Sequence, residues 1–373
     1  MTVLHGRAPR PATSGELPTS EVASSTKVRG AGAGVAAVRS ARHRLRRRTT
    51  VVTAGLLVFL AIMVAVALTL GDFPISVGQV VESLTGRGTR ATDFIVHELR
   101  LPRAVTALAV GACFGLSGAI FQSMMRNPLA SPDIIGITSG ASAAAVVAIL
   151  MLQLSGVAVS AFAFTGALVT ALAIYLLAWK DGVAGYRLVL VGIGIAAMLA
   201  AVIDYLMTRA QIWDAQVALL WLTGSLNGAS ATEMRPLLLL MLGLVPLAVW
   251  AGGALACLQL GDDAATSVGV RVERSRLLLI VLGVALASIA TAAAGPVAFV
   301  AFVSGPIARR LTHGTGIALI PAALVGAAVV LTADVVGQHL LPVQLPVGVL
   351  TAAVGAPYLL YLLVRSNRIG HGG

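Results

Sequence analysis

Apolar stretches about 20 residues long recur along almost the whole of this 373-residue chain, and an α-helix of that length can cross a bilayer. Only 11% of the residues are charged, against about a quarter in soluble domains, and the mean hydropathy is +0.93. A backbone in lipid must pair its polar groups internally, so these stretches are expected to be helices rather than the alternating strands of a barrel. The sequence therefore predicts an all-α polytopic membrane protein.

Ten membrane-spanning helices are predicted from these stretches, and an even number places both termini on the same side. The eighth is short and begins at Gly295-Pro296, which predicts a broken segment there. The spans are rich in Gly, Ala and Ser, and small residues let helices pack closely in lipid. The predicted spans cover residues 51–70, 101–123, 134–153, 157–178, 188–208, 236–257, 276–294, 296–311, 318–337 and 346–364.

Lysine and arginine give the predicted orientation, because cytoplasmic loops carry an excess of both. With the N-terminus inside, the inner segments hold twenty of these residues and the outer segments six, so both termini are expected in the cytoplasm. Residues 1–50 are rich in Ala, Ser, Pro, Gly and Arg, which predicts a disordered basic cytoplasmic tail rather than a signal peptide or a nucleic-acid-binding arm. A ten-helix domain over 51–366 and a cytoplasmic C-terminal tail over 367–373 complete the predicted organisation.

Ionisable residues are scarce inside the predicted spans, where Asp204 and Asp334 lie near the outer ends. This scarcity argues against a proton-driven carrier, which generally needs buried ionisable groups. No nucleophile–base or metal-ligand spacing occurs, and Cys113 and Cys257 fall inside apolar spans, so we expect no catalytic residue and no metal site. Neither lysine lies in the Gly-Lys-Ser/Thr of a P-loop, so energy for uphill transport would have to come from another chain.

One polar segment, LQLGDDAATSVGVRVERSR at residues 258–276, lies on the predicted cytoplasmic side between the sixth and seventh spans. Asp262 and Asp263 suit a helix N-terminus and Gly269 suits a helix end, so a helix of about one to two turns is predicted between them. A second short segment over 271–276 leads into the next span. This patch is either a solvated loop or, because small side chains let a short helix lie in a groove, a docking surface for another protein.

Two arginines, Arg100 and Arg103, bracket a Leu-Pro pair at the outer end of the second span. They either snorkel to the lipid interface or dock an acidic partner outside. On the inner side, residues 124–132 contain two prolines, which predicts a tight turn between the second and third spans.

Six motifs occur in order along the chain: RLPRAVTALAVGACFGLSGAIFQ, RNPLASPDIIGITSGA, WLTGSL, LGDDAATSVGV, AGPVAFVAFVSGPIARRL and LPVGVLTAAVGAPYLLYLL. Together they resemble the permease family of the iron-siderophore and cobalamin ABC importers, the FecCD type. The resemblance runs from about residue 52 to residue 366. It implies a ten-helix fold, a dimer with the pathway at its centre, two cytoplasmic ATPase subunits that hold ATP and Mg, and an external binding protein that delivers a ferric chelate.

The resemblance also implies roles for particular residues. Arg100 and Arg103 would meet acidic residues of the binding protein. The residues expected near the pathway or its gate are Trp221, Gly224, Gly295 and Pro296. The residues expected in the coupling helices seated on the ATPase are Leu260, Gly261, Asp262, Asp263, Ala264, Ala265, Ser267, Gly269 and Arg271.

Some positions depart from the general family pattern. Many members have Pro-His where this chain has Gly305-Pro306, and Glu where it has Gln344. The runs GPIARRL, ADVVGQHL and QLPVGV are closer to the second permease subunit of the ferric-enterobactin system, which implies a heterodimer with a sister permease. A basic docking position of the cobalamin relative aligns with Gln338, which argues against cobalamin as the cargo.

The leading hypothesis is a non-catalytic permease subunit in the bacterial cytoplasmic membrane that moves ferric siderophore inward by alternating access. Its partners would be a sister permease, two ATPases, a siderophore-binding protein and membrane lipid, with no nucleic acid. The alternatives are a stand-alone secondary transporter of a small organic solute, a permease for cobalamin or haem, and a structural scaffold. The break at Gly295-Pro296 favours the secondary transporter, and the lack of a buried acid argues against it.

Overall fold

The computed structural model describes residues 25–179, 185–313 and 317–369, and within these ranges the chain is helical with no β-strand. This confirms the predicted all-α class. The helices in chain order are α1 (Ser25–Thr69), α2 (Val77–Leu84), α3 (Arg90–Asp93), the π-helix η1 (Phe94–Arg100), α4 (Leu101–Met124), α5 (Ile137–Leu150), α6 (Val157–Ala178), α7 (Gly185–Arg209), α8 (Ile212–Leu222), α9 (Ala231–Leu258), α10 (Asp262–Ser267), α11 (Val272–Ala294), α12 (Val300–Thr312), α13 (Leu319–His339) and α14 (Val347–Ile369).

The chain divides into two units, Met1–Arg47 and Arg48–Gly373. Residues 1–24 of the expected N-terminal tail, and residues 370–373 of the C-terminal one, lie outside the described residues. The described part of the N-terminal tail is helical rather than irregular, because α1 already begins at Ser25. Alanine and arginine, two of the strongest helix formers, make up most of the sequence just before the first predicted span.

Seven helices in the described ranges are long and apolar enough to cross a membrane: His43–Thr69, Arg90–Met124, Val157–Ala178, Tyr186–Arg209, Ala231–Leu258, Val272–Ala294 and Leu319–His339. Shorter apolar helices cover Ile137–Leu150, Ile212–Leu222 and Val347–Tyr361. Each predicted span overlaps one helix of the structure, namely α1, α4, α5, α6, α7, α9, α11, α12, α13 or α14. The chain is therefore a polytopic helical membrane protein.

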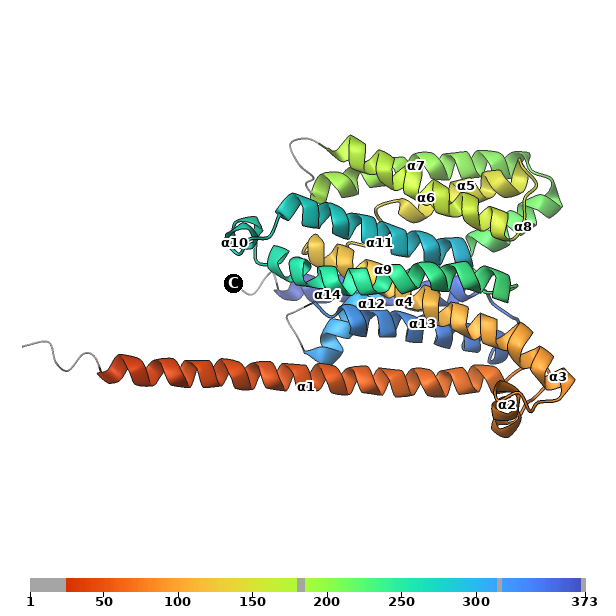
Figure 1. The fold of residues 1–373 in the computed structure, drawn as a ribbon. Coiled ribbons are helices and arrows are strands. Elements are labelled where there is room, and N and C mark those ends of the chain that lie inside the picture. The colour runs from red at the N-terminus through yellow and green to blue at the C-terminus, as the bar shows by residue number, and fades with distance from the viewer. Residues whose placement is uncertain (1–24, 180–184, 314–316, 370–373) are drawn as a thin grey trace, which may run out of the picture. The chain divides into compact units, whose positions relative to one another are not determined.

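Helix α4 is the centre of the larger hydrophobic core, and most of its side chains are buried. Helices α9, α11, α12 and α13 pack around it (Figure 1). Glycines allow this close approach: Gly111 lies against Gly326 of α13, and Gly118 lies against Ala301 of α12, with no room for a side chain at either α4 position. The predicted packing of small residues in this span is thus confirmed.

Helices α5, α6 and α7 form a second core together with α11 (Figure 1). Helix α5 begins at Ile137, three residues later than its predicted span, because Gly136 takes a left-handed φ of +87°. Gly136 lies against the backbone of α7 at Gly192. This contact holds the start of α5 beside α7.

Two interruptions shape the middle of the chain. The break predicted at Gly295-Pro296 is present, because α11 ends at Ala294 and α12 begins only at Val300. Helix α8 was not predicted: its 11 residues are too few for a span and lie between the fifth and sixth predicted spans.

Candidate functional site

The polar segment between α9 and α11 contains the short helix α10, as the sequence predicted. Its end at Gly269 is also as predicted: Gly269 has a φ of +85°. The Gly269 N–H donates to the Thr266 carbonyl at 2.9 Å, and the Val270 N–H donates to the Ala265 carbonyl at 3.0 Å. These two bonds form a Schellman motif, which satisfies carbonyls that the helix end would otherwise leave unpaired.

Helix α10 is fixed to the membrane core by one apolar anchor and one ion pair. The Ala265 side chain is completely buried in the larger core. Arg276 in the first turns of α11 donates to both carboxylate oxygens of Asp262, at 3.0 and 3.1 Å, and to Glu273 at 3.2 Å. The separate second segment expected over 271–276 is wrong: residues 272–276 are the start of α11, because the helical pattern continues without a break into the span.

Arg126 supports the same segment from the turn after α4, and the sequence did not predict this role. Its side chain donates to the carbonyl of Leu258, the last residue of α9, at 2.7 Å. A cationic side chain at a helix C-terminus pairs with an orphan carbonyl and favours the helix dipole. The signal available in the sequence was Arg126 at the start of RNPLASP, but its partner lies 132 positions away.

The outward surface of α10 is open and partly apolar. Leu260 and Val268, which flank the helix, are 74% and 63% exposed. The predicted coupling residues Asp262, Asp263, Ser267, Gly269 and Arg271 are exposed, and Gly261 and Ala264 are half-buried. Helix α10 thus presents an exposed, partly apolar surface while it packs on α9 and α11.

The two outer arginines both have internal partners. Arg100 donates to three backbone carbonyls: Leu68 at 2.8 Å, Thr69 at 3.2 Å and Phe73 at 2.6 Å. It therefore caps the C-terminal end of α1. Docking of Arg100 against an acidic partner stays a prediction.

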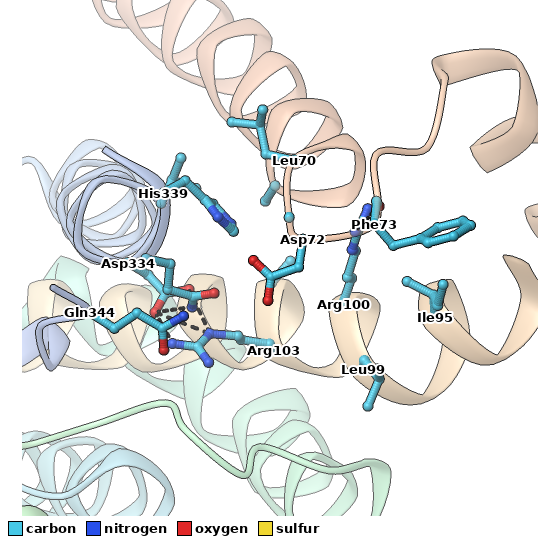
Figure 2. Close-up of a pocket in the computed structure, with 15 residues that line it drawn as sticks. Leu70, Asp72, Phe73, Ile95, Leu99, Arg100, Arg103, Asp334, His339 and Gln344 are labelled. Carbon is cyan, nitrogen blue, oxygen red and sulfur yellow. Dashed lines mark hydrogen bonds and ion pairs between the residues drawn. The ribbon is translucent and has the colours of Figure 1, made fainter. Parts of the chain in front are cut away.

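Arg103 forms a network with residues far away in sequence. It donates to both oxygens of Asp334 on α13 at 2.8 to 3.2 Å, and to the side-chain oxygen of Asn227 at 2.8 Å. Gln338 donates to the same carboxylate at 3.1 Å. Figure 2 shows the Arg103–Asp334 pair beside Asp72 and His339, at a pocket of about 320 Å³. Docking of Arg103 against an acidic partner also stays a prediction. The structure adds that Arg103 links α4 to α13 through Asp334.

The four residues predicted near a pathway or gate lie together. A side chain built on Gly224, which has a φ of +72°, would lie 2.5 Å from the Pro296 carbonyl oxygen, and one built on Gly295 would lie 2.5 Å from the Trp221 carbonyl oxygen. The Gly348 N–H at the start of α14 donates to the Gly224 carbonyl at 3.0 Å. Close backbone contacts thus join the end of α8, the α11–α12 break and the start of α14, and we call this meeting point the junction.

Asp133, in the turn before α5, is a titratable group that sequence reasoning did not single out. Burial raises the pKa of its carboxyl group to about 6, and a hydrogen bond with Thr138 acts in the opposite direction. Within the described ranges, no three His, Cys, Asp or Glu side chains are grouped so that they could hold a metal ion.

Sequence comparison with known families gives a match to the FecCD transport family over residues 57–365. The chain belongs to the FecCD transport family. The predicted family resemblance is thus confirmed. The match runs from the apolar part of α1 to the last turns of α14, so it includes α10, the arginines Arg100 and Arg103, and the junction.

Several transport-system permeases and solved structures are similar to this chain. The ferric enterobactin transport system permease protein FepG of Escherichia coli (strain K12) is 43% identical over 302 residues, which are 80% of this chain and 91% of FepG. The achromobactin transport system permease protein CbrC of Dickeya dadantii (strain 3937) is 42% identical, over 87% of this chain and 95% of CbrC. A metal-chelate type ABC transporter solved in an inward-facing conformation superposes with a TM-score of 0.74 and 27% identity, over 85% of this chain and 99% of that one.

Proposed function

We propose that this FecCD-family chain is the permease subunit of an ATP-driven importer that carries a ferric siderophore into the cytoplasm of a bacterium. Family membership and the named transport permeases at 43% and 42% identity support the permease role. The ferric siderophore cargo rests on the transport systems for which these relatives are named. On this proposal the chain performs no catalysis itself, and ATP and Mg are bound by a partner ATPase.

The mounting of α10 is the single observation that carries the proposal. Its outward surface is exposed at Leu260, Val268 and Gly269, while its inward side is fixed by Ala265 and the Asp262–Arg276 pair. A solvated loop needs no such fixation, whereas a lever that receives force from an ATPase does. We propose that two ATPase subunits bind the cytoplasmic side of a permease dimer and press on this segment.

The proposed topology has ten crossings with both termini in the cytoplasm. It counts the seven long apolar helices together with α5, α12 and α14. The α10 segment and Arg126 then lie at the inner surface, and the Arg103–Asp334 pair lies at the outer surface. The excess of lysine and arginine in the inner segments supports this orientation.

The proposed mechanism is alternating access. ATP binding by the partner would shift α10, and α9 and α11 would carry the movement to the junction of Gly224, Gly295 and Pro296. Bare backbone contacts at this junction allow two packing arrangements to interchange without moving large side chains. Each ligand, ATP or a loaded binding protein, would favour the state to which it binds more tightly.

We propose the remaining partners from the same family. A sister permease would complete the pathway as a heterodimer. The similarity to FepG, a permease of the ferric enterobactin transport system, supports this pairing. A binding protein outside the membrane would deliver the chelate to the surface around Arg100 and Arg103. Lipid would cover the apolar outer faces of helices such as α6 and α9, whose exposed side chains are mostly apolar.

Gly269→Tyr tests the coupling role of α10. A side chain at Gly269 meets no other atom within 4 Å, so the change projects into the space where the partner would bind. We expect the uptake of radioactive iron as ferric siderophore to fall about tenfold, which is within the usual range for coupling between two binding sites. The amount of protein in the membrane should stay normal. Gly269→Asn, which tolerates the left-handed backbone, should retain most uptake.

Gly86→Tyr is the matched control. Gly86 also has a left-handed φ, of +73°, and also meets nothing within 4 Å, but it lies in the turn after α2, on the proposed outer side. Normal uptake with Gly269→Tyr would contradict the coupling role.

Transport by the purified chain alone would favour a secondary transporter, and unchanged uptake after deletion of the chain would favour a scaffold.

A further inference from the structure

Asp204 on α7 is a charged side chain inside an apolar helix that the function proposed so far leaves unused. It lies five residues before the end of the candidate span Tyr186–Arg209, which is about 7.5 Å at 1.5 Å per residue. Its side chain is exposed, and no described residue forms a hydrogen bond or ion pair with it. An ionised carboxylate at this depth is costly against lipid and is normally found facing a water-filled cavity or a partner.

The surroundings of Asp204 are polar on the protein side. It lines an open pocket of about 280 Å³ together with Thr138, Ser139 and Ser142 of α5. The Ser139 and Ser142 hydroxyls have no hydrogen-bond partner among the described residues, so both can bind a passing molecule or water. Polar groups without hydrogen-bond partners are costly against acyl chains, so we expect this wall of the pocket to face water.

On the proposed topology, the pocket reaches deep into the membrane. Ser142 lies eight residues before the outer end of α5 at Leu150, and Ser139 lies eleven residues before it. At 1.5 Å per residue these positions are about 12 and 16 Å below that end, near the middle of a hydrocarbon layer about 30 Å thick. The pocket thus runs from Asp204 on its outer side to hydroxyls near the midplane.

The same pocket touches the junction described above. Pro296 of the α11–α12 break and Leu222, the last residue of α8, form its remaining wall together with small and apolar side chains. A movement of the break would therefore change the size of the pocket. This contact links the free polar groups to the break between α11 and α12.

We propose that Asp204 and the hydroxyls of Ser139 and Ser142 line the substrate passage, and that the Asp204 carboxylate makes this passage favour ferric chelates of zero or positive charge over anionic ones. This inference rests on the proposed importer function and names the charge class of its cargo. A fixed negative charge in a narrow, partly desolvated passage raises the local concentration of cations and lowers that of anions. Hydroxyl groups contribute hydrogen bonds to the amide and hydroxamate oxygens and N–H groups of a chelate without holding it tightly.

Charged thiol reagents test the site in the assembled importer, whatever its natural cargo. Ser139→Cys is placed in a Cys113→Ser, Cys257→Ser background and treated with a cationic or an anionic methanethiosulfonate. We expect both reagents to react from the outer side and the cationic one to react faster. Adding Asp204→Asn should lower the cationic-to-anionic rate ratio several-fold, because one unit charge about 10 Å away in water changes the local concentration of each reagent about twofold, in opposite directions.

Val169→Cys is the matched control, because Val169 is 60% exposed in the middle of α6, on a face that should contact lipid. It should react with neither charged reagent. Failure of both reagents at Ser139→Cys would overturn the placement of the pocket on a water-filled passage. An unchanged rate ratio in Asp204→Asn would overturn the role of the charge.

Uptake of a matched series of chelates tests the selectivity itself. The series is one linear ferric trihydroxamate with its terminal amine free, acetylated or succinylated, so that net charge is +1, 0 or −1 with the same iron centre. Asp204→Asn should raise the uptake of the anionic form relative to the cationic form several-fold. Equal changes in the uptake of all three forms would overturn the proposal. If the wild type takes up none of them but the thiol reagents react as expected, the proposed cargo is wrong and the passage site is supported.

Discussion

Asp334 and Asp204 occupy similar places in sequence, near the C-terminal ends of two apolar helices, but their environments are opposite. Asp334 is 6% exposed and accepts hydrogen bonds from Arg103 and Gln338. Asp204 is exposed and has no partner among the described residues. The contrast shows that the neighbouring helix decides whether a charge in an apolar helix ties two helices together or stays exposed.

The helices next to each aspartate explain the difference. α13, which carries Asp334, packs along the central helix α4, and Arg103 stands on the adjoining turn of α4. α7, which carries Asp204, packs on α5, which offers hydroxyls but no cation at that level. A buried carboxylate needs a counter-charge, whereas a solvated one does not.

Breaking the paired site should have the largest effect on folding. Asp334→Ala leaves the partly buried Arg103 guanidinium without its counter-charge, and we expect a loss of about 3 kcal/mol in the free energy of unfolding. Thermal unfolding of the detergent-solubilised protein, followed by size-exclusion chromatography, measures this loss. Asp204→Ala is the matched control and should change stability by less than about 0.5 kcal/mol.

The double variant Arg103→Leu, Asp334→Leu sharpens the same prediction. Removing both charges should recover much of the lost stability, because replacing an ion pair by apolar residues costs less than leaving one charge alone. Equal stability of Asp334→Ala and the wild type would show that the pair does not hold α4 to α13.

A third aspartate, Asp133, is partly buried and should make stability depend on pH. Its native pKa of about 6 exceeds the usual value of 3.8, so the native state holds the proton more tightly than the unfolded state. Stability should therefore fall as the pH rises from about 4 to about 6 and stay level above that range. In melting curves, Asp133→Asn should match the wild type near pH 3.5 and be more stable than it near pH 7.5; a constant difference at all pH values would contradict this cause.

The surface pair of Asp262 with Arg276 should have the smallest effect on stability. Asp262→Asn removes an exposed ion pair, and such pairs contribute about 1 kcal/mol or less. We nevertheless expect weaker coupling between ATP hydrolysis and uptake, because α10 loses its link to α11. Glu273→Gln, which removes the other contact of Arg276, is the control and should leave coupling closer to normal; equal coupling in both variants would contradict the role of the Asp262 link.

Much of the fold followed from local properties of the sequence. Apolar length and period located the helices that became α4, α6, α7, α9, α11 and α13. Gly269 and the acidic pair before it located α10, because capping and left-handed backbone depend only on residues a few positions apart. Helix α8 was not predicted because an 11-residue apolar helix is too short for a span and its N-cap residue makes no side-chain hydrogen bond.

The sequence by itself determined that this is a helical membrane protein of the FecCD type, with a short capped helix between two spans and a break at Gly295-Pro296. These features depend on hydropathy, helix capping and ordered motifs, which are all local. Only the tertiary structure decided that Arg103 pairs with Asp334, that Arg126 caps α9, and that Asp204 faces a pocket of hydroxyls. The partners of these charges lie tens to hundreds of residues away, so their environment is set by which helices pack together.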